Sequence, residues 1–216
     1  VNMNFKIWFD ETLPKLGKRA ISFKKIINYL DSLPDPIIIL ETGCLRKIDS
    51  FSGDGQSTLI FDKYTQYRGN SSRVFSVDIN EQNVNICKSI VSEKVYLERN
   101  DSIRFISKFH NLLDKKQKIS LLYLDSFDVN WDYPSESSAH HLKELTASIP
   151  YINKNTLVVV DDAPVNIVGY TDENNKFQQI KDPRIGGKGI LVHEYAKSVN
   201  AEIFFSHYQV AYKKII

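Results

Sequence analysis

Short runs of apolar, largely β-branched residues recur along the chain and are separated by longer amphipathic stretches. In five of these runs the apolar residues are nearly continuous, without the alternation that a half-exposed strand would show. Near-continuous apolar runs are typical of parallel strands that are buried on both faces of a sheet. We therefore predict five parallel strands, at residues 37–40, 74–77, 95–97, 119–124 and 157–160.

Helical patterns fill the intervals between the predicted strands. Apolar residues three or four positions apart share a helix face, and this spacing occurs in residues 81–91, 102–113 and 137–149. A further helical pattern covers residues 5–33, and two prolines end it at positions 34 and 36. Because strands and helices alternate, the chain is expected to form a doubly wound parallel sheet.

The C-terminal part of the chain breaks this alternation. Residues 202–206 and 209–213 have strand patterns with almost nothing between them, which predicts a hairpin with an antiparallel last strand. The predicted fold class is therefore α/β, a Rossmann-like doubly wound sheet of seven mostly parallel strands. We expect one domain over residues 1–216, with an N-terminal helical segment at 1–35 and the Rossmann-like core at 36–216.

Composition narrows the class of protein further. The chain has 28 basic and 26 acidic residues in a length of 216, a balance that predicts neither nucleic-acid binding nor membrane binding from bulk charge. No apolar run reaches the length of a membrane span, and residues 1–9 carry one basic residue, so no signal peptide is expected. Two cysteines, Cys44 and Cys87, do not make a disulfide framework. A cytoplasmic location is our prediction.

Polar residues follow the predicted strands, and ligands of open α/β sheets bind outside the carboxyl ends of strands. The first strand ends in Glu41-Thr42-Gly43 and opens a long loop that closes at residues 53–58. Glycines in this loop allow tight turns and a close approach to a ligand. The loop contains neither a G-x-G-x-x-G pattern nor a Gly-Lys-Ser/Thr sequence, so it is neither a nicotinamide fingerprint nor a P-loop.

The next two strand ends offer groups suited to a nucleoside. Asp78 could accept hydrogen bonds from both hydroxyls of a ribose. Asp101 and Ser102 form a small polar pair after the third strand. The alternative is that Asp78 or Asn80, and Asp101 or Ser102, simply cap the helices that follow.

Three carboxylates are expected to converge at the ends of the fourth and fifth strands. Asp125 ends the fourth run, and Asp161 and Asp162 end the fifth. Repulsion among three carboxylates favours a bound cation, and oxygen ligands favour Mg²⁺ or Ca²⁺ over zinc. The alternative is an acidic, solvated rim with helix caps.

These strand ends together resemble class I S-adenosylmethionine (SAM)-dependent methyltransferases, in particular the metal-dependent O-methyltransferases of the catechol and macrocin types. The resemblance covers roughly residues 37–165. About ten residues separate Gly43 from Gly55, whereas the family usually has two or three there. The resemblance implies Mg²⁺ or another divalent cation on Asp125, Asp161 and Asp162. It implies that SAM contacts Glu41, Gly43, Gly55, Ser57, Asp78, Asp101, Ser102 and Asp125.

The implied activity is transfer of a methyl group from SAM to a hydroxyl of a small molecule, a sugar or a natural product, with Asp125 as a catalytic residue. The general base of the family does not carry over. Asp128 stands where the catechol enzymes have a lysine, and Pro164 stands where some macrocin-type relatives have a histidine. The remaining candidates for the base are His140, His141, His193 and Lys188, and we predict His141.

Two further hypotheses remain open at this stage. One is a hydroxylase on the same fold, resembling cephalosporin hydroxylase, which would need iron and an oxidant. The other is a non-catalytic protein that binds a nucleotide. The loops at 128–136 and 171–189 are expected to form the substrate side of the site. The partner we expect is a small hydroxylated molecule, and a homo-oligomer is an open alternative.

Overall fold

A seven-stranded sheet forms the centre of the protein, in a computed structural model that describes residues 5–54, 56–69, 71–166, 169–171, 173–179 and 184–216. The strands lie in the order β10-β11-β5-β4-β1-β2-β3. β1 to β5 are parallel, and β11 is antiparallel to both of its neighbours. The predicted fold class is therefore confirmed. The strands are β1 (Ile38–Thr42), β2 (Arg73–Asp78), β3 (Val95–Arg99), β4 (Leu121–Leu124), β5 (Leu157–Val160), β10 (Glu202–Ser206) and β11 (Val210–Lys213).

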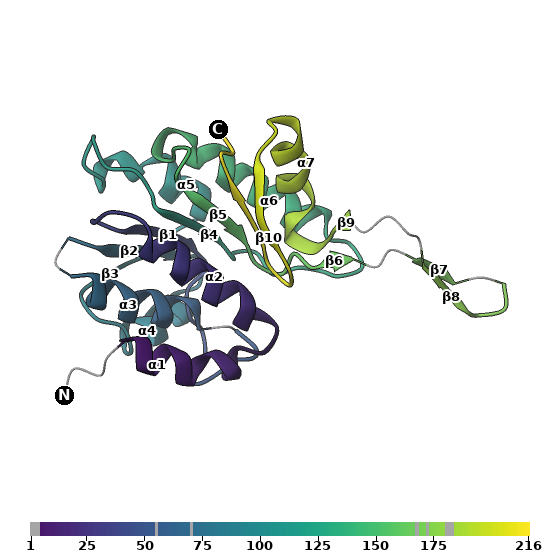
Figure 1. The fold of residues 1–216 in the computed structure, drawn as a ribbon, viewed down its shortest axis with the longest axis horizontal. Coiled ribbons are helices and arrows are strands. Elements are labelled where there is room, and N and C mark those ends of the chain that lie inside the picture. The colour runs from purple at the N-terminus through teal and green to yellow at the C-terminus, as the bar shows by residue number, and fades with distance from the viewer. Residues whose placement is uncertain (1–4, 55, 70, 167–168, 172, 180–183) are drawn as a thin grey trace.

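Helices cover both faces of this sheet (Figure 1). Successive residues of one strand face opposite helical layers, as Ile39 and Leu40 of β1 show by packing into different apolar clusters. This two-sided burial explains the continuous apolar runs in the sequence. One layer holds α1 (Phe5–Thr12), η1 (Leu13–Arg19), α2 (Ala20–Asp31) and α3 (Ser57–Arg68), and the other holds α5 (Ser102–Ser107), α6 (Ser135–Ser148) and α7 (Ile190–Ser198). Helix α4 (Glu81–Lys88) packs on the loop after β1 through Val84 and Cys87.

Several helices are shorter than the sequence pattern predicts. The pattern at 5–33 is divided into α1, the 3₁₀ segment η1 and α2, because Gly17 has a φ of 53° that no α-helix contains. The pattern at 102–113 is divided between α5 and the 3₁₀ turn η2 (Phe109–Asn111). A third 3₁₀ turn, η3 (Ile149–Tyr151), extends α6. Arg19, two residues after this kink, reaches Asp161 at the end of β5.

Between β5 and α7 the chain forms short strands that the sequence pattern did not predict. Strands β6 (Val165–Asn166) and β9 (Arg184–Ile185) pair near the body, and β7 (Gly169–Thr171) pairs with β8 (Phe177–Gln179) in a hairpin that extends away from it (Figure 1). The predicted substrate-side loop at 171–189 falls partly on this hairpin, and its residues 172 and 180–183 lie outside the described residues. The 3₁₀ turn η4 (Gly187–Gly189) follows β9 and leads into α7.

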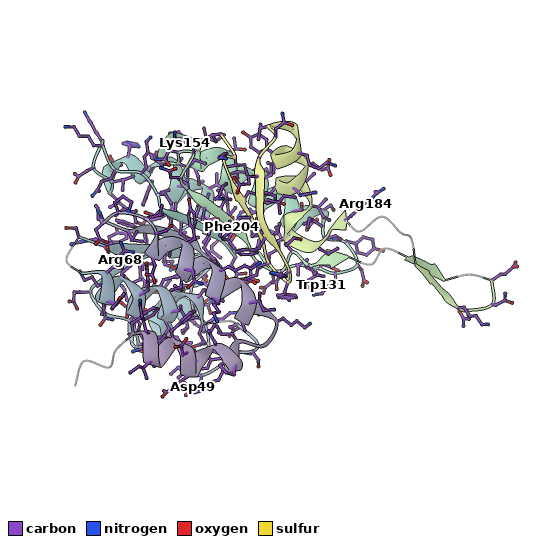
Figure 2. All side chains as sticks on the ribbon, viewed as in Figure 1. Asp49, Arg68, Trp131, Lys154, Arg184 and Phe204 are labelled. Atoms are coloured by element: carbon purple, nitrogen blue, oxygen red, sulfur yellow. The ribbon has the colours of Figure 1, made fainter. Side chains whose placement is uncertain are left out.

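Side chains fill the space between the sheet and both helical layers, whereas charged groups such as Lys154 and Arg184 project outward (Figure 2). Cys44 and Cys87 are both buried and free. None of the described helices is long and apolar enough to cross a membrane.

The aromatic contact between α2 and the sheet provides a test of this core. Phe23 is fully buried, with its ring centroid 5.9 Å from those of both Phe61 and Tyr123. Replacing Phe23 with Ala should lower the free energy of unfolding by about 3–5 kcal/mol, because it leaves a cavity. Ile21 on the same helix is 59% exposed, so Ile21→Ala should stay within about 0.5 kcal/mol of wild type. Urea denaturation measures both, and equal losses would contradict the packing described.

Candidate active site

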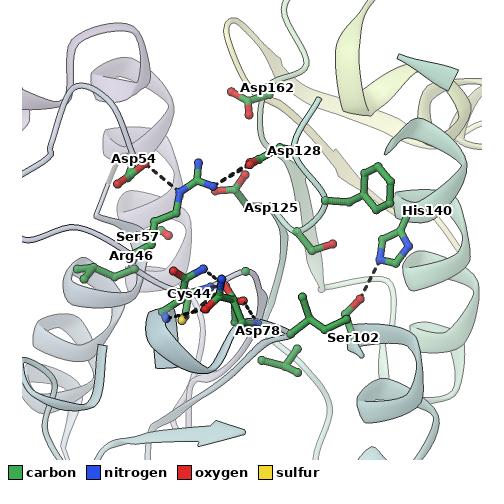
Figure 3. A pocket seen from close by; sticks show the side chains of 18 of the residues that line it. Cys44, Arg46, Asp54, Ser57, Asp78, Ser102, Asp125, Asp128, His140 and Asp162 are labelled. Carbon is green, nitrogen blue, oxygen red and sulfur yellow. Dashed lines mark hydrogen bonds and ion pairs between the residues drawn. The ribbon is translucent and has the colours of Figure 1, made fainter. Parts of the chain in front are cut away.

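A cavity of about 570 Å³ opens at the carboxyl ends of β1 to β5, a size typical of small-molecule sites. Asp78 and Ser102 lie toward one end of it, and Asp125 and Asp162 toward the other (Figure 3). Of the predicted site residues, those that line it are Gly43, Ser57, Asp78, Asp101, Ser102, Asp125 and Asp162. Glu41, His141 and Asp161 do not belong to its lining, and Gly55 lies outside the described residues.

Gly43 is required by the close approach of two strand ends. Its φ is 80°, and a Cβ there would lie 2.6 Å from the backbone oxygen of Asp125. Only glycine accepts both conditions without strain. The backbone after β1 therefore runs directly against the residue that ends β4.

Glu41 is fully buried beneath this turn and supports it from within. Its Oε2 accepts hydrogen bonds from Thr58 Oγ1 and Ser76 Oγ, each at 2.7 Å. Thr58 Oγ1 also accepts the backbone N–H of Leu45 at 2.9 Å. Burial raises the pKa of Glu41 to about 7. In this structure Glu41 joins β1, β2 and the start of α3 and does not reach the cavity surface.

The sequence left open whether Asp78 lines a ligand site or caps the helix after β2, and in the structure Asn80 is the cap. Asn80 caps α4, since its Oδ1 accepts the N–H groups of Gln82 and Asn83. Asp78 accepts the backbone N–H of Asn80 at 2.7 Å and that of Cys44 at 3.3 Å. The carboxylate is thereby fixed at the tip of β2 while it still lines the cavity.

The adjacent histidines on α6 have different surroundings. His140 lines the cavity, with Nε2 at 2.9 Å from Ser102 Oγ and 3.3 Å from Glu144 Oε1. His141 is fully buried and donates Nδ1–H to the backbone oxygen of Ser137 at 2.6 Å. Burial lowers the pKa of His141. The structure thus brings His140, and not His141, to the cavity, because adjacent residues cannot share a helix face.

The acidic cluster at β4 and β5 is held by two cations that the sequence analysis did not assign to it. Arg19 Nε donates to both carboxylate oxygens of Asp161, at 3.0 and 2.8 Å, and its Nη2 lies 3.1 Å from Asp162 Oδ1. Tyr123 donates its hydroxyl to Asp161 Oδ2 at 3.1 Å. Asp161 is 0% exposed, so its whole carboxylate is taken up by protein donors.

Lys188 provides the second cation. Its Nζ lies 2.7 Å from Asp125 Oδ1 and 3.1 Å from Asp162 Oδ2. Burial alone would lower the pKa of Lys188, but the surrounding carboxylates outweigh it and raise that pKa. Lys188 is therefore an ammonium cation and not the general base that was one of the candidates. His193, another candidate, lies 2.8 Å from the hydroxyl of Tyr212 on β11 and is not part of the cavity lining.

The pKa values of the two carboxylates beside Lys188 move in opposite directions. Burial, together with the neighbouring Asp161 and Asp162, raises the pKa of Asp125 well above its ordinary value. For Asp162 burial acts in the same direction, but Lys188, Tyr208 and Arg19 outweigh it and lower the pKa. Asp162 is thus the more firmly ionised of the two.

The predicted metal ligands do not fit a divalent ion in this arrangement. Each of Asp125, Asp161 and Asp162 already has a cationic partner. Among the described residues, no three His, Cys, Asp or Glu side chains are placed to hold a metal ion together. We therefore derive no chemical step through a metal.

The long loop after β1 closes over the cavity through Arg46. Its Nε lies 3.1 Å from Asp54 Oδ1, and its Nη1 lies 2.9 Å from Asp128 Oδ2 in the loop after β4 (Figure 3). The long loop thus connects the first and fourth strand ends. Sequence reasoning had assigned no role to Arg46.

Exposed apolar side chains also line the cavity. Ile79 is 73% exposed and Phe127 49% exposed, and the ring of Phe127 lies 5.3 Å from that of His140. The backbone of Phe127 has a φ of 42°, a conformation that residues with side chains adopt at a cost. Such outliers cluster at functional sites. The sequence pattern gave no indication of these two residues, since neither follows an amphipathic period.

Comparisons with known proteins bear on the fold. No protein-family model and no curated protein matches the chain. Among solved structures, a candidate rRNA methylase from Clostridium thermocellum is similar, with a TM-score of 0.51 and 12% identity, over 89% of this chain and 96% of that one. The chain has the methyltransferase fold.

Two other structures with this fold are more distant. Human methyltransferase-like protein 13 in complex with SAH has a TM-score of 0.48 and 9% identity, over 89% of this chain and 78% of that one. The MycE methyltransferase of the mycinamycin biosynthetic pathway, in complex with Mg and SAH, has a TM-score of 0.44 and 14% identity. That match covers 65% of this chain and 30% of MycE. The chain likewise spans 44% of a SAM-dependent methyltransferase from Agrobacterium tumefaciens.

The raised pKa of Glu41 predicts a specific pH dependence of stability. Its pKa is about 7 in the folded chain against an ordinary 4.5, so the folded state holds a proton that the unfolded state releases between these values. This contribution to the free energy of unfolding is fully present below about pH 4.5 and is lost as pH rises through 7, by about 3 kcal/mol in total.

Glu41→Gln should remove this component, because an amide stays neutral and its oxygen can still accept from Thr58 and Ser76. Urea denaturation of both proteins at pH 5 and pH 8 tests the expectation. Between pH 5 and pH 8, the free energy of unfolding should fall by about 2–3 kcal/mol more for wild type than for the variant. Equal losses would mean that Glu41 is already ionised in the folded protein at pH 5.

Proposed function

We propose that the protein is a SAM-dependent methyltransferase that methylates a hydroxyl group of a small molecule, a sugar or a natural product. The observation that carries the proposal is the convergence of Gly43, Asp78, Ser102 and Asp125 on one cavity at the carboxyl edge of a methyltransferase-fold sheet. The fold gives no function by itself.

The Asp78 end of the cavity suits the nucleoside part of SAM. The Asp78 carboxylate is fixed by backbone N–H groups and could accept the ribose hydroxyls. Ile79 and Phe127 offer apolar surface on which a planar base could pack. Asp101 caps α5 through the N–H of Arg104 and also lines the cavity, beside Ser102.

The charge of the cavity suits a cationic ligand. SAM carries a sulfonium that supplies the methyl group, and a carboxylate nearby stabilises that positive charge. At the other end of the cavity, the carboxylates of Asp125 and Asp162 lie beside the cations Lys188 and Arg19. Asp125 and Asp162 are the members of this cluster that line the cavity.

Asp125 is the residue best placed to receive the proton of an acceptor hydroxyl. Lys188 holds its Oδ1, whereas no side chain or backbone group of the described residues donates a hydrogen bond to its Oδ2. The side chain is 19% exposed and faces the cavity. A positioned carboxylate can act as a general base, and holding the acceptor next to the methyl donor contributes through proximity. His141, predicted from the sequence as a base, is enclosed on α6, so we give it no step.

SAM binding at Asp78 is the direct test. Isothermal titration calorimetry should show binding of SAM and of its product S-adenosylhomocysteine (SAH) to wild type. Asp78→Asn should weaken both at least about tenfold, because an amide replaces a charged hydrogen-bond acceptor. Asp132→Asn, at a residue that does not line the cavity, serves as the control and should bind as wild type does. No SAM or SAH binding to wild type would refute the proposal.

A further inference from the structure

The carboxylates at β4 and β5 lie where water screens them poorly. The side chains of Asp161, Asp162 and Asp125 are 0%, 17% and 19% exposed. Carboxylates at such burial repel one another unless positive charge lies beside them, since repulsion grows as screening falls. The sequence alone suggested a divalent metal for this purpose.

In the structure, the ammonium group of Lys188 contacts these carboxylates, where the sequence suggested a metal ion. Lys188 Nζ is within reach of three oxygens, which are Asp125 Oδ1 at 2.7 Å, Asp162 Oδ2 at 3.1 Å and the backbone oxygen of Asp125 at 3.4 Å. An ammonium group has three donors and no acceptor, so its donor set matches these oxygens. The side chain of Lys188 is 1% exposed.

We propose that Lys188 is a built-in replacement for a divalent metal ion, so that the cluster of Asp125, Asp161 and Asp162 works without metal. In this role Lys188 is a positioning residue. Its ammonium group contacts the carboxylates of both Asp125 and Asp162 and so reduces the repulsion between them. It also binds Oδ1 of Asp125, so that the second oxygen of Asp125 is held toward the cavity. The inference deepens the proposed function and rests on it for the role of Asp125.

Backbone geometry shows that Lys188 is fixed in this place. The neighbouring Gly187 has a φ of 53°, and a Cβ on it would collide with the backbone oxygen of Asp162. A Cβ on Gly189 would lie 2.6 Å from that of Ala163. The N–H of Lys188 donates to the oxygen of Asp162 at 3.0 Å. These glycines let the η4 turn pack directly on the end of β5, which carries the lysine into the cluster.

Arg19, from the N-terminal part of the chain, is the second cation of the cluster. It pairs with Asp161 through Nε and with Asp162 through Nη2, and its Nη1 donates to the backbone oxygen of Gly53 at 3.0 Å. A divalent ion held at metal–oxygen distances of about 2.0–2.6 Å would have to displace one of these two cations. A site whose carboxylates already have fixed cationic partners gains little from such an exchange.

The test begins with the wild-type chain and simple metal salts. Its metal content after purification should be substoichiometric by mass spectrometry. Its melting temperature should be the same in EDTA, MgCl₂ and MnCl₂ at matched ionic strength, and its SAH affinity should agree within about twofold between EDTA and MgCl₂. A metal-dependent rise in melting temperature, or loss of SAH binding on chelation, would overturn the proposal.

A substitution of the lysine provides a gain-of-response test. Lys188→Met should lower the melting temperature by about 6–15 °C, because it leaves buried carboxylates unpaired. MnCl₂ or MgCl₂ should then raise the melting temperature of this variant, because the vacated position is lined by oxygen ligands. A variant that melts like wild type, or that gains no response to either metal, would contradict the assigned role.

A surface lysine variant and a double variant serve as controls for Lys188→Met. Lys197 is 59% exposed and pairs only at the surface with Glu194, so Lys197→Met should shift the melting temperature by no more than about 2 °C. If Lys188→Met does not fold, the double variant Lys188→Met with Asp125→Asn should be folded and unresponsive to metal, since it removes one charge of each sign. A double variant that fails to fold, or that responds to metal, would also count against the proposal.

The experiments distinguish failure of the proposed function from failure of the proposed role of Lys188. If wild type shows no SAM or SAH binding, the proposed function is wrong, and the metal response of the variants is then evidence about the cluster alone. If wild type binds SAH only in the presence of a metal, the proposed function stands and the replacement of the metal by Lys188 is wrong.

Discussion

The pairing of three buried carboxylates with Arg19 and Lys188 is the interaction on which the rest of the site depends. Without it, the ends of β4 and β5 would repel each other at the point where the sheet must stay closely packed. Arg19 stands 142 residues before Asp161 in the chain, and Lys188 stands 63 residues after Asp125. Two distant segments are thus drawn to one edge of the sheet by charge, and they enclose the cavity there.

This constraint links the topology to the chemistry. The break at Gly17 turns the N-terminal segment so that Arg19 reaches β5, and the close packing of η4 carries Lys188 to the same edge. Asp125 remains directed at the cavity because its other oxygen is already occupied. Asp78 lies at the opposite end, fixed by backbone donors. A donor nucleoside and an acceptor hydroxyl could therefore be held in one cavity, each against its own carboxylate.

The buried strands were predictable because two-sided burial leaves a continuous apolar pattern, as in residues 157–160. The strand-end residues followed from the rule that parallel strands expose their carboxyl ends at one edge, which brought Asp78 and Asp125 to the same cavity. The partners of the carboxylates could not be predicted in the same way. Arg19 and Lys188 lie far away in sequence, and local spacing carries no information about such pairs.

Other parts of the site depend on details that a hydrophobic pattern does not contain. Which of His140 and His141 faces the cavity is set by the rotation of α6, and the pattern on that helix left this open. Phe127 reaches the cavity through a positive φ that no periodicity indicates. Arg46 closes the cavity because the loop after β1 is long, and the departure from the family's loop length was visible in the sequence although its purpose was not.

The most direct test of the account is a crystal structure of the protein grown with SAH and MnCl₂, with anomalous data collected to locate manganese. The account predicts SAH in the cavity, with its ribose against Asp78, and the Lys188 ammonium between Asp125 and Asp162 with no anomalous peak there. An anomalous peak between these two carboxylates, with Lys188 displaced, or SAH bound away from Asp78, would contradict it.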